Sequence, residues 1–393
     1  GTPLTAEAAA ASLRNSNLLR AKAEVEACQG RVVFTLASAN PRFELTLTNA
    51  NCSIVLEKEG CLLGTGDFRF ECEDSGAARC VRLVPNRWRT GGDPVDAIEF
   101  VVLEADENGI PRALVDALRR EEVDLTTCLS PFDLERARLD GSLQRVTQPS
   151  NSTGILFFNT QRDALASARV RRAIAMCLDI EEIVERALGH HAPSHVATSL
   201  LPPMMRRSAA RFPSDRAQGL ALLEELRFRP RSLSLLVPWA PRPYLPKPHA
   251  VARAIQSQLA EIGIDTQLLE THSGHEYFGD LAEGRYDMAL AGWIADTPDP
   301  ADFLEALLYS KMTDSRIHAN YSRWQHEPTD EAILAFRQQP SDDNRKAIES
   351  LLLTEAPLVP LMYGQPLVVH SPRLRNVRCT AAGVVCLSAV SVS

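Results

Sequence analysis

The sequence has no run that approaches the roughly 20 consecutive apolar residues a helix needs to cross a bilayer. It also shows no internal repeat and no low-complexity tract. Apolar residues make up 45% and charged residues 23% of its 393 positions, which is the composition of a globular protein rather than a disordered one. Because a chain of this length is too long for one ordinary core, two lobes are expected.

Motifs that mark common catalytic sites are absent. There is no Gly-x-Ser-x-Gly nucleophile elbow, no P-loop, no His-Glu-x-x-His pair and no dinucleotide-binding glycine motif. Ser, His and Asp residues occur, but nothing in their order along the chain gathers them into one site. The sequence therefore predicts neither an enzyme nor a bound cofactor.

Acidic side chains outnumber basic ones in this chain, and the net charge is -8. This argues against nucleic acid as a partner, because binding phosphates requires a basic face. It does not oppose a zwitterionic or cationic small ligand. The first residues, from Gly1 onward, contain neither an initiator Met nor a signal peptide and look like a cut end.

Nine cysteines are present, but none has the Cys-x-x-Cys spacing of zinc sites and thioredoxin-like redox sites. Cys128 and Cys177 lie in apolar segments and are expected to be buried thiols. Three other pairs have spacings that suit a disulfide across a hairpin: Cys52 with Cys61, Cys72 with Cys80, and Cys379 with Cys386. Whether these disulfides form stays open at this point, and they would require an oxidising compartment.

Two groups of histidines have spacings conceivable for metal ligands: His190 and His191 with His195, and His272 with His275. Adjacent histidines point to different faces of a helix or a strand, and no carboxylate lies at a supporting spacing. No metal site is predicted.

Amphipathic helices alternate with short apolar strands along the chain, which predicts an α/β fold. Up to about Pro149 the pattern is that of one mixed lobe, in which Phe43–Leu47 is expected to be a strand. Ile155–Asn159 is a fully apolar strand, as in a sheet buried on both faces.

The segment from Ala250 to Leu308 is the most informative. It has the pattern helix, strand, helix, strand, followed by a Pro-rich turn at Gly292–Pro300 and a capped helix. Asp299, with Pro300 after it, is expected to be the N-cap of that helix. Open α/β sheets present ligand-binding groups at the carboxyl ends of their strands, so this turn is a candidate binding site.

Motifs in order along nearly the whole chain resemble the family 5 extracytoplasmic solute-binding proteins of ABC transporters, which include dipeptide-, oligopeptide- and nickel-binding proteins. The resemblance rests on the following segments: Pro3–Glu7, Gly64–Phe70 (with Asp67 where the family has Pro), Asn86–Arg89, Glu122–Leu125, Phe158–Thr160, Val170–Ile174, Leu178–Asp179, Ile262–Ile264 and Tyr286–Pro300.

The resemblance implies a two-lobed periplasmic-binding-protein fold of type II, a Venus flytrap with mixed sheets and hinge crossovers. Lobe I would comprise residues 1–153 and lobe II residues 154–357, and residues 358–393 would return to lobe I. The crossover strands near Gly154 and Leu358 would form the hinge, and ligand would favour the closed state. The family carries further residues before the point where this sequence begins. Either those residues were removed, or they belong to another chain or to an upstream part of the protein that completes lobe I.

Asp296 matches the aspartate that pairs with the α-ammonium of the peptide in the dipeptide and oligopeptide binders. The alternative is an Asx-turn residue before Thr297. Trp293 either packs on a ligand side chain or belongs to the core. Leu290 stands where the oligopeptide binders carry an arginine that reaches the peptide carboxylate, so that contact is missing here.

Two further groups of residues are candidates to line or cover the cleft. One follows the family's Asn-Tyr-x-x-Trp-like region: Asn320, Tyr321 and Trp324. The other lies on a proline-rich loop, where surface packing and a lid are both plausible: Trp239, Arg242 and Tyr244.

The function implied is a substrate-binding protein that captures a small ligand, first of all a short peptide, in an interlobe cleft and delivers it to an ABC transporter permease. Its location would be periplasmic or at the cell surface. One alternative is a cytoplasmic ligand-sensing domain of a larger, transcriptional regulator. Another is a degenerate member of the family that no longer binds ligand.

Overall fold

The computed structural model describes residues 3–20, 22–58, 61–71, 80–88, 95–104, 112–129, 133, 143–189, 196–205, 214–229, 232–313, 319–380 and 383–393. The chain forms two compact units. Unit 1 comprises Gly1–Gln148 and Leu367–Ser393, and unit 2 comprises Pro149–Pro366. Within the described ranges, no helix has the length and apolar character needed to cross a membrane.

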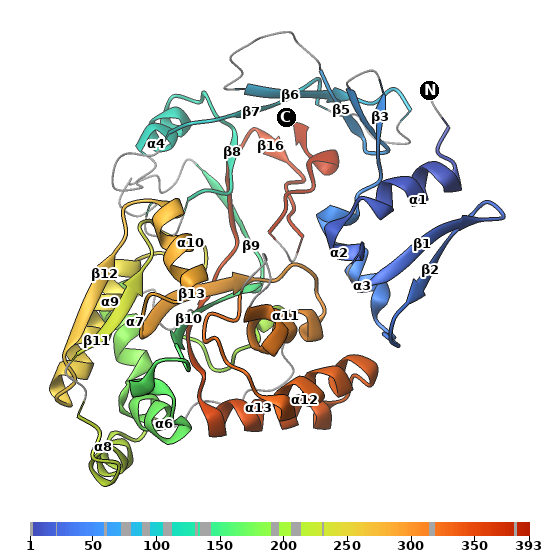
Figure 1. The fold of residues 1–393 in the computed structure, drawn as a ribbon. Coiled ribbons are helices and arrows are strands. Elements are labelled where there is room, and N and C mark those ends of the chain that lie inside the picture. The colour runs from blue at the N-terminus through green and yellow to red at the C-terminus, as the bar shows by residue number, and fades with distance from the viewer. Residues whose placement is uncertain are drawn as a thin grey trace. The chain divides into compact units, whose positions relative to one another are not determined.

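Unit 1 is built from short elements (Figure 1). Its helices are α1 (Ala6–Arg14), α2 (Asn17–Arg20), α3 (Phe43–Thr46) and α4 (Arg112–Arg119). The strands in its described ranges form five small sheets: β1 (Ala23–Cys28) with β2 (Arg31–Leu36); β3 (Val55–Lys58) with β4 (Cys61–Gly64); β5 (Phe68–Phe70), β6 (Cys80–Pro85) and β7 (Ile98–Val101); β8 (Leu125–Thr126), β15 (Leu367–His370) and β9 (Gln144–Thr147); and β16 (Leu374–Arg375) with β17 (Ser391–Val392).

The N-terminal part of unit 1 has its own small core. Thr5 caps α1 by accepting a hydrogen bond from the Ala8 amide, and Leu13 on this helix packs with Val25 of β1. The β1–β2 turn consists of Gln29 and Gly30, both with positive φ, as a two-residue hairpin requires. The predicted strand at Phe43–Leu47 is wrong: the segment forms the short helix α3.

Six cysteines are free thiols: Cys28, Cys52, Cys128, Cys177, Cys379 and Cys386. Cys177 is buried as expected, but Cys128 is exposed, so the prediction of a buried thiol there is wrong. Cys52 is buried and its Sγ donates to the Thr46 carbonyl, so the predicted pair with Cys61 is wrong. Cys379 lies opposite Val385 in a β-bridge. Cys386 is therefore one residue out of register with Cys379, and adjacent side chains of an extended chain point to opposite faces, so the predicted Cys379–Cys386 disulfide is also wrong. The pair Cys72–Cys80 involves a segment outside the described residues.

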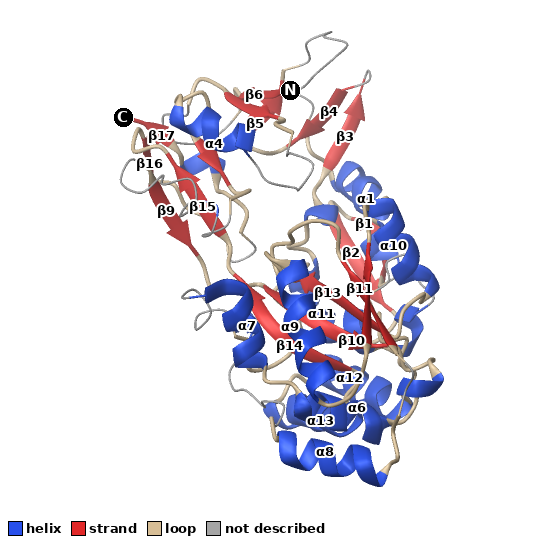
Figure 2. Ribbon diagram, turned by 90° about the vertical axis from the view of Figure 1, so that its left-hand side faces the viewer, coloured by secondary structure: helices blue, strands red, loops and turns tan. Residues whose placement is uncertain are grey.

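Unit 2 is built around a five-stranded sheet in the order β12 (Thr266–Glu270), β11 (Leu233–Val237), β13 (Met288–Ile294), β10 (Ser152–Phe158) and β14 (Leu358–Gly364). β10 runs antiparallel to both of its neighbours, and β11 runs parallel to both of its own. Every residue of β10 and β14 is buried, as the apolar composition of these segments predicts. The strands run side by side through the unit in Figure 2.

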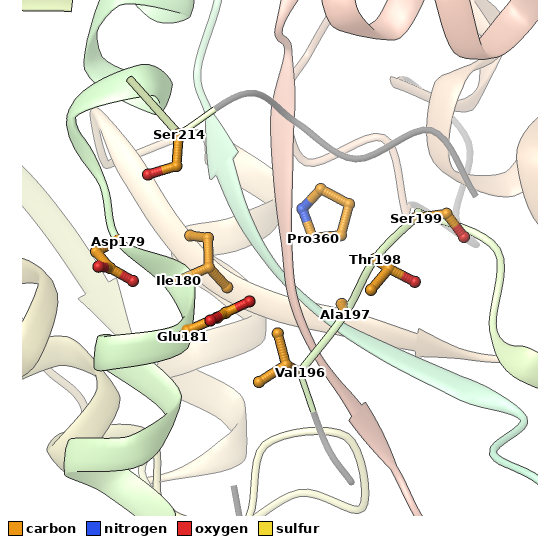
Figure 3. Close-up of a pocket in the computed structure, with 9 residues that line it drawn as sticks. All are labelled: Asp179, Ile180, Glu181, Val196, Ala197, Thr198, Ser199, Ser214 and Pro360. Carbon is orange, nitrogen blue, oxygen red and sulfur yellow. The ribbon is translucent and has the colours of Figure 1, made fainter. Parts of the chain in front are cut away.

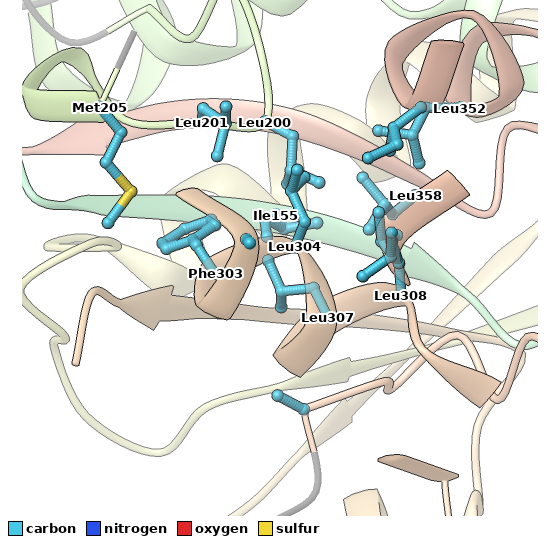
Figure 4. Packing of buried hydrophobic residues seen from close by; sticks show 14 of the residues in the cluster. Ile155, Leu200, Leu201, Met205, Phe303, Leu304, Leu307, Leu308, Leu352 and Leu358 are labelled. Atoms are coloured by element: carbon cyan, nitrogen blue, oxygen red, sulfur yellow. The ribbon is translucent and has the colours of Figure 1, made fainter. Parts of the chain in front are cut away.

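Eight described helices surround this sheet: α6 (Ala168–Cys177), α7 (Ile180–Leu188), α8 (Arg216–Glu225), α9 (Pro248–Glu261), α10 (Gly274–Glu283), α11 (Pro300–Leu308), α12 (Glu327–Gln338) and α13 (Asp342–Glu355). The main core lies where α11, α12 and α13 meet β10 and β14. Phe303, Leu304 and Leu307 of α11 share this core with Ile155 and Leu358 (Figure 4).

A buried cation on α6, Arg171, links two other segments of unit 2 to that helix. Arg171 of α6 is 2% exposed and donates to the carbonyls of Leu165, Ala166 and Glu355 at 2.7–2.9 Å. The Glu355 carbonyl belongs to the last turn of α13, where carbonyl groups have no partner within the helix. Burial lowers the pKa of Arg171 to about 10, and Glu355 opposes that shift.

The chain crosses between the two units at Gln148–Pro149 and at Pro366–Leu367. β15 returns to unit 1, where it pairs with β8 and β9. The two strands expected to form the hinge, β10 and β14, both lie wholly within the sheet of unit 2.

Candidate functional site

The strand ends of unit 2 define one edge of its sheet. From the strand directions, the carboxyl ends of β11, β12, β13 and β14 lie at the same edge as the amino end of β10. The chain also leaves unit 2 at this edge, before β10 and after β14. Loops at the carboxyl ends of the strands are where open α/β sheets place ligand-binding groups. This edge is therefore the candidate site.

The loop after β13 presents Asp296 at this edge. Ala295 is buried, and its amide donates to the Asn151 carbonyl at 2.8 Å, which extends the β10–β13 ladder. Thr297 is also buried, whereas Asp296 between them is exposed. The predicted cap is confirmed, because Asp299 Oδ1 accepts from the Ala301 amide at the start of α11. Asp296 is thus an exposed residue on a short loop whose two ends are fixed.

The proline-rich loop between β11 and α9 carries a cation held among aromatic rings. The guanidinium carbon of Arg242 lies 4.0 Å from the ring centroid of Trp239 and 5.5 Å from that of Phe278. The Trp239 and Phe278 rings are 6.0 Å apart in an edge-to-face arrangement. Nε and Nη2 of Arg242 are buried, and neither meets a hydrogen-bond acceptor among the described residues. Buried donors of this kind are costly unless a partner arrives, so Arg242 is suited to an anion.

Tyr244 follows on the same loop and packs against strand glycines. A Cβ at Gly292 would lie 2.4 Å from Tyr244 Cδ2, and a Cβ at Gly154 would lie 2.4 Å from the Tyr244 carbonyl oxygen. Gly154 and Gly292 are paired across β10 and β13. On β14, a Cβ at Gly364 would lie 2.3 Å from the Pro243 carbonyl oxygen. Three adjacent strands therefore lack side chains where the loop lies against them.

Further tyrosines lie beside this loop. The hydroxyl of Tyr277 donates to the Leu290 carbonyl at 2.7 Å, and that of Tyr286 donates to the Tyr321 carbonyl at 2.6 Å. Burial raises the pKa of both groups, and also that of Tyr321 and of Tyr244. All four phenols therefore stay protonated at neutral pH and act as neutral groups.

The other predicted residues occupy different positions. Trp293 is half-buried and packs against the α11–α13 core. Tyr321 is half-buried with its ring edge-to-face on Phe157, 5.4 Å between centroids. Asn320 and Trp324 are 2% and 4% exposed, and the Asn320 side chain bonds both the amide and the carbonyl of Trp324. In this structure Asn320 and Trp324 serve the core of unit 2.

Phe278 and the three strand glycines were not anticipated from the sequence. The signal for Phe278 is weak, because its contact with Arg242 joins α10 to a loop some 35 residues earlier. Leu290, at the position where the oligopeptide binders carry an arginine, is fully buried in β13. Leu290 offers no charged group, whereas Arg242 is a cation at this edge.

A pocket of about 220 Å³ lies elsewhere in unit 2, between the start of α7, the segment 196–199 and Pro360 of β14 (Figure 3). Its polar groups already have partners within the protein. Asp179 Oδ1 accepts from the Glu182 amide, Ser199 Oγ donates to the Leu201 carbonyl, and Ser214 Oγ donates to the Leu178 carbonyl. The pocket therefore offers no obvious recognition chemistry.

Among the described residues, no three His, Cys, Asp or Glu side chains lie close enough together to hold a metal ion. His272 and His275 are among the described residues, so neither belongs to such a group. His190, His191 and His195 lie outside the described residues.

Proteins similar to this chain in sequence include peptide-binding proteins. The Escherichia coli (strain K12) dipeptide-binding protein is 25% identical over 332 residues, 82% of this chain and 58% of the relative. Di/tripeptide-binding protein 2 of Pseudomonas aeruginosa (strain UCBPP-PA14) is 30% identical over 319 residues, 79% of this chain and 57% of the relative. The chain thus spans less than two thirds of the length of these curated relatives.

Solved structures share the fold. A dipeptide-binding protein from Pseudoalteromonas sp. SM9913 in complex with Met-Leu superposes with a TM-score of 0.79 at 19% identity, over 100% of this chain and 85% of that one. DppA from Helicobacter pylori in complex with the peptide STSA gives 0.74 at 20% identity, over 96% and 76%. The predicted two-lobed periplasmic-binding-protein fold is confirmed by these likenesses.

Residues 1–315 match the family described as bacterial extracellular solute-binding proteins, family 5. This match covers most of the chain and agrees with the motifs found in the sequence. The chain therefore belongs to family 5 of the bacterial extracellular solute-binding proteins.

Proposed function

We propose that this protein binds short peptides without chemically changing them and hands them to the permease of an ABC transporter. The observation that carries the proposal is the exposed Asp296 on its fixed loop at the carboxyl edge of the unit 2 sheet. Family membership and the names of the relatives, which are dipeptide- and di/tripeptide-binding proteins, support the ligand class.

Asp296 would bind the α-ammonium of the peptide. A carboxylate and an ammonium form a charge-assisted hydrogen bond, which is strong where a ligand excludes water from the pair. The net charge of -8 also favours a ligand with a cationic end. The ammonium is common to all free peptides, so this contact selects peptides without selecting their side chains.

Arg242 would bind the other end of the peptide. Its guanidinium is held on Trp239 and has buried donors without acceptors among the described residues. A planar guanidinium matches a carboxylate with two parallel hydrogen bonds. An α-carboxylate would supply the acceptors that Arg242 lacks, and this contact would replace the one that Leu290 cannot make. Asp296 and Arg242 together would favour a zwitterionic ligand of limited length.

The protein would act outside the cytoplasm, in the periplasm or at the cell surface. The description of the family as extracellular supports this location. Disulfides do not support this location, since Cys52, Cys379 and Cys386 are free thiols. The partner would be a membrane permease that accepts the ligand-bound form.

Native mass spectrometry of gently purified protein tests the proposal. The expected result is a bound mass within the range of short peptides, absent from the Asp296→Asn variant. Asp265→Asn is the matched control, because Asp265 is an exposed aspartate just before β12, at the opposite edge of the sheet. Wild-type protein that purifies empty and takes up no added dipeptide would refute the proposal. Turnover of an added peptide would refute its non-enzymatic part.

A further inference from the structure

A cluster of charged side chains lies behind the Asp296 loop, between α11 and α12. Arg337 of α12 donates to Asp302 Oδ1 at 3.1 Å and also pairs with Glu305, both on α11. The side chains of Arg337, Asp302 and Glu305 are 10%, 11% and 20% exposed. Buried ion pairs of this kind add little stability over well-packed apolar residues, so their use here calls for another explanation.

The cluster is connected to the binding loop through one carboxylate. Asp302 uses Oδ1 for Arg337 and Oδ2 for Thr297, whose hydroxyl donates to it at 2.8 Å. The same Thr297 oxygen accepts from the Asp299 amide at 3.2 Å. The Thr297 hydroxyl therefore has a defined acceptor, Asp302, and a defined donor, the Asp299 amide. Thr297 is 4% exposed. A chain of contacts runs from Arg337 through Asp302 to the residue directly after Asp296.

The other side of Asp296 is fixed independently. Ala295 is held by the Asn151 carbonyl as a continuation of the β10–β13 ladder. Asp296 is thus an exposed residue between two buried residues, each with a defined partner. A charge-assisted bond is sensitive to distance and direction, and a displacement of about 1 Å in a supporting residue can cost a large part of such an interaction.

We infer that Thr297, Asp302 and Arg337 are positioning residues that hold the Asp296 carboxylate in the orientation needed to bind the ammonium of the ligand. This inference rests on the proposed function. None of the three contacts ligand. Arg337 and Asp302 define the direction of the Thr297 hydroxyl, and Thr297 fixes the backbone that carries Asp296.

Thr297 is the residue to change, because Val has nearly the same shape and removes only the hydroxyl, and Ser restores it. The experiment measures dissociation constants for the dipeptide Met-Leu by isothermal titration calorimetry, together with the thermal unfolding of each variant. Thr297→Val is expected to weaken binding about 10-fold, and Thr297→Ser to stay within about 3-fold of wild type.

A double-mutant cycle separates positioning from a merely structural role. If Thr297 acts through Asp296, Thr297→Val should have little further effect in an Asp296→Asn background. An equal loss in both backgrounds would overturn the inference, and so would unchanged binding by Thr297→Val. If Thr297→Val melts far below wild type, the dissociation constants of Thr297→Ser and Asp302→Asn are compared with that of the wild type instead. Binding by Asp302→Asn as tight as that of the wild type would then overturn the inference. Failure of the wild type to bind Met-Leu would instead refute the proposed function and the inference with it.

Discussion

The ring of Tyr244 lies directly against the backbone of Gly292, so that a Cβ on Gly292 would come within 2.4 Å of Tyr244 Cδ2. This contact seats the proline-rich loop on the centre of the unit 2 sheet. The same loop holds Arg242 over Trp239. The absence of a side chain at Gly292 of β13 therefore lets the loop pack here and helps to determine the position of Arg242.

Gly292→Ala should destabilise the protein by about 2 kcal/mol or more, because the new methyl group would overlap both the Tyr244 ring and the Thr153 carbonyl oxygen. Gly279→Ala is the matched control. Gly279 lies within α10, where the nearest atom to a new Cβ is Arg285 Nη2 at 3.8 Å. This control should stabilise the protein by about 0.5–1 kcal/mol, since alanine is the better helix former. Urea unfolding measures both, and equal effects of the two substitutions would contradict the packing argument.

Arg171→Met should cost about 3 kcal/mol or more of unfolding free energy. The substitution keeps an apolar stem but leaves the carbonyls of Leu165, Ala166 and Glu355 without their donor. The neighbouring Arg172 is exposed on the same helix, and Arg172→Ala should stay within about 0.5 kcal/mol of wild type. If Arg171→Met unfolds at the same urea concentration as Arg172→Ala, Arg171 does not tie α6 to the end of α13.

Stability should fall as the pH rises above about 10, the ordinary pKa of tyrosine. Burial raises the pKa of Tyr244, Tyr277, Tyr286 and Tyr321 in the folded state. Between the unfolded and the folded pKa, the unfolded chain loses protons that the folded chain keeps, so the free energy of unfolding decreases with pH. Below pH 10 these groups contribute no pH dependence.

Absorbance near 295 nm, which reports tyrosinate, should therefore rise together with the loss of near-ultraviolet circular dichroism. Tyrosinate that formed with an ordinary pKa at all positions, in protein that stayed folded, would contradict the burial of these four side chains.

Arg242→Gln should weaken the binding of a dipeptide with a free carboxylate by about 10-fold or more, because charge-assisted bidentate bonds are lost. The same variant should change little in the binding of the corresponding dipeptide amide, which has no carboxylate to lose. Arg172→Ala serves as the control for removing one positive charge. A loss of equal size for the acid and the amide would show that Arg242 supports the loop without recognising the carboxylate.

Local signals in the sequence predicted much of unit 2. The apolar runs of β10 and β14 reflect burial on both faces, and Asp299 followed by Pro300 identified the start of α11. The turn after β13 is a local pattern, whereas the role predicted for Asp296 on that turn came from the resemblance to the family. In unit 1 the pattern was weaker. The apolar segment Phe43–Leu47 forms a short helix instead of a strand, and Phe43 and Leu47 pack, partly buried, against the α1–β1 core.

Long-range features could not be predicted from the sequence. The glycines on β10, β13 and β14 meet the Tyr244 loop only because of the register between strands that are far apart in the chain. The partners of Arg337 depend on how α12 packs against α11. Sequence spacing contains neither the register of distant strands nor the packing of separate helices.

The affinity of the wild-type protein for Met-Leu, compared with that for N-acetyl-Met-Leu, tests the central claim most directly. Acetylation removes the ammonium and keeps the rest of the peptide. The account predicts that wild-type protein binds the free dipeptide at least about 10-fold more tightly, and that Asp296→Asn abolishes this difference. Equal affinities of the wild type for the two peptides, or no binding of either, would contradict it.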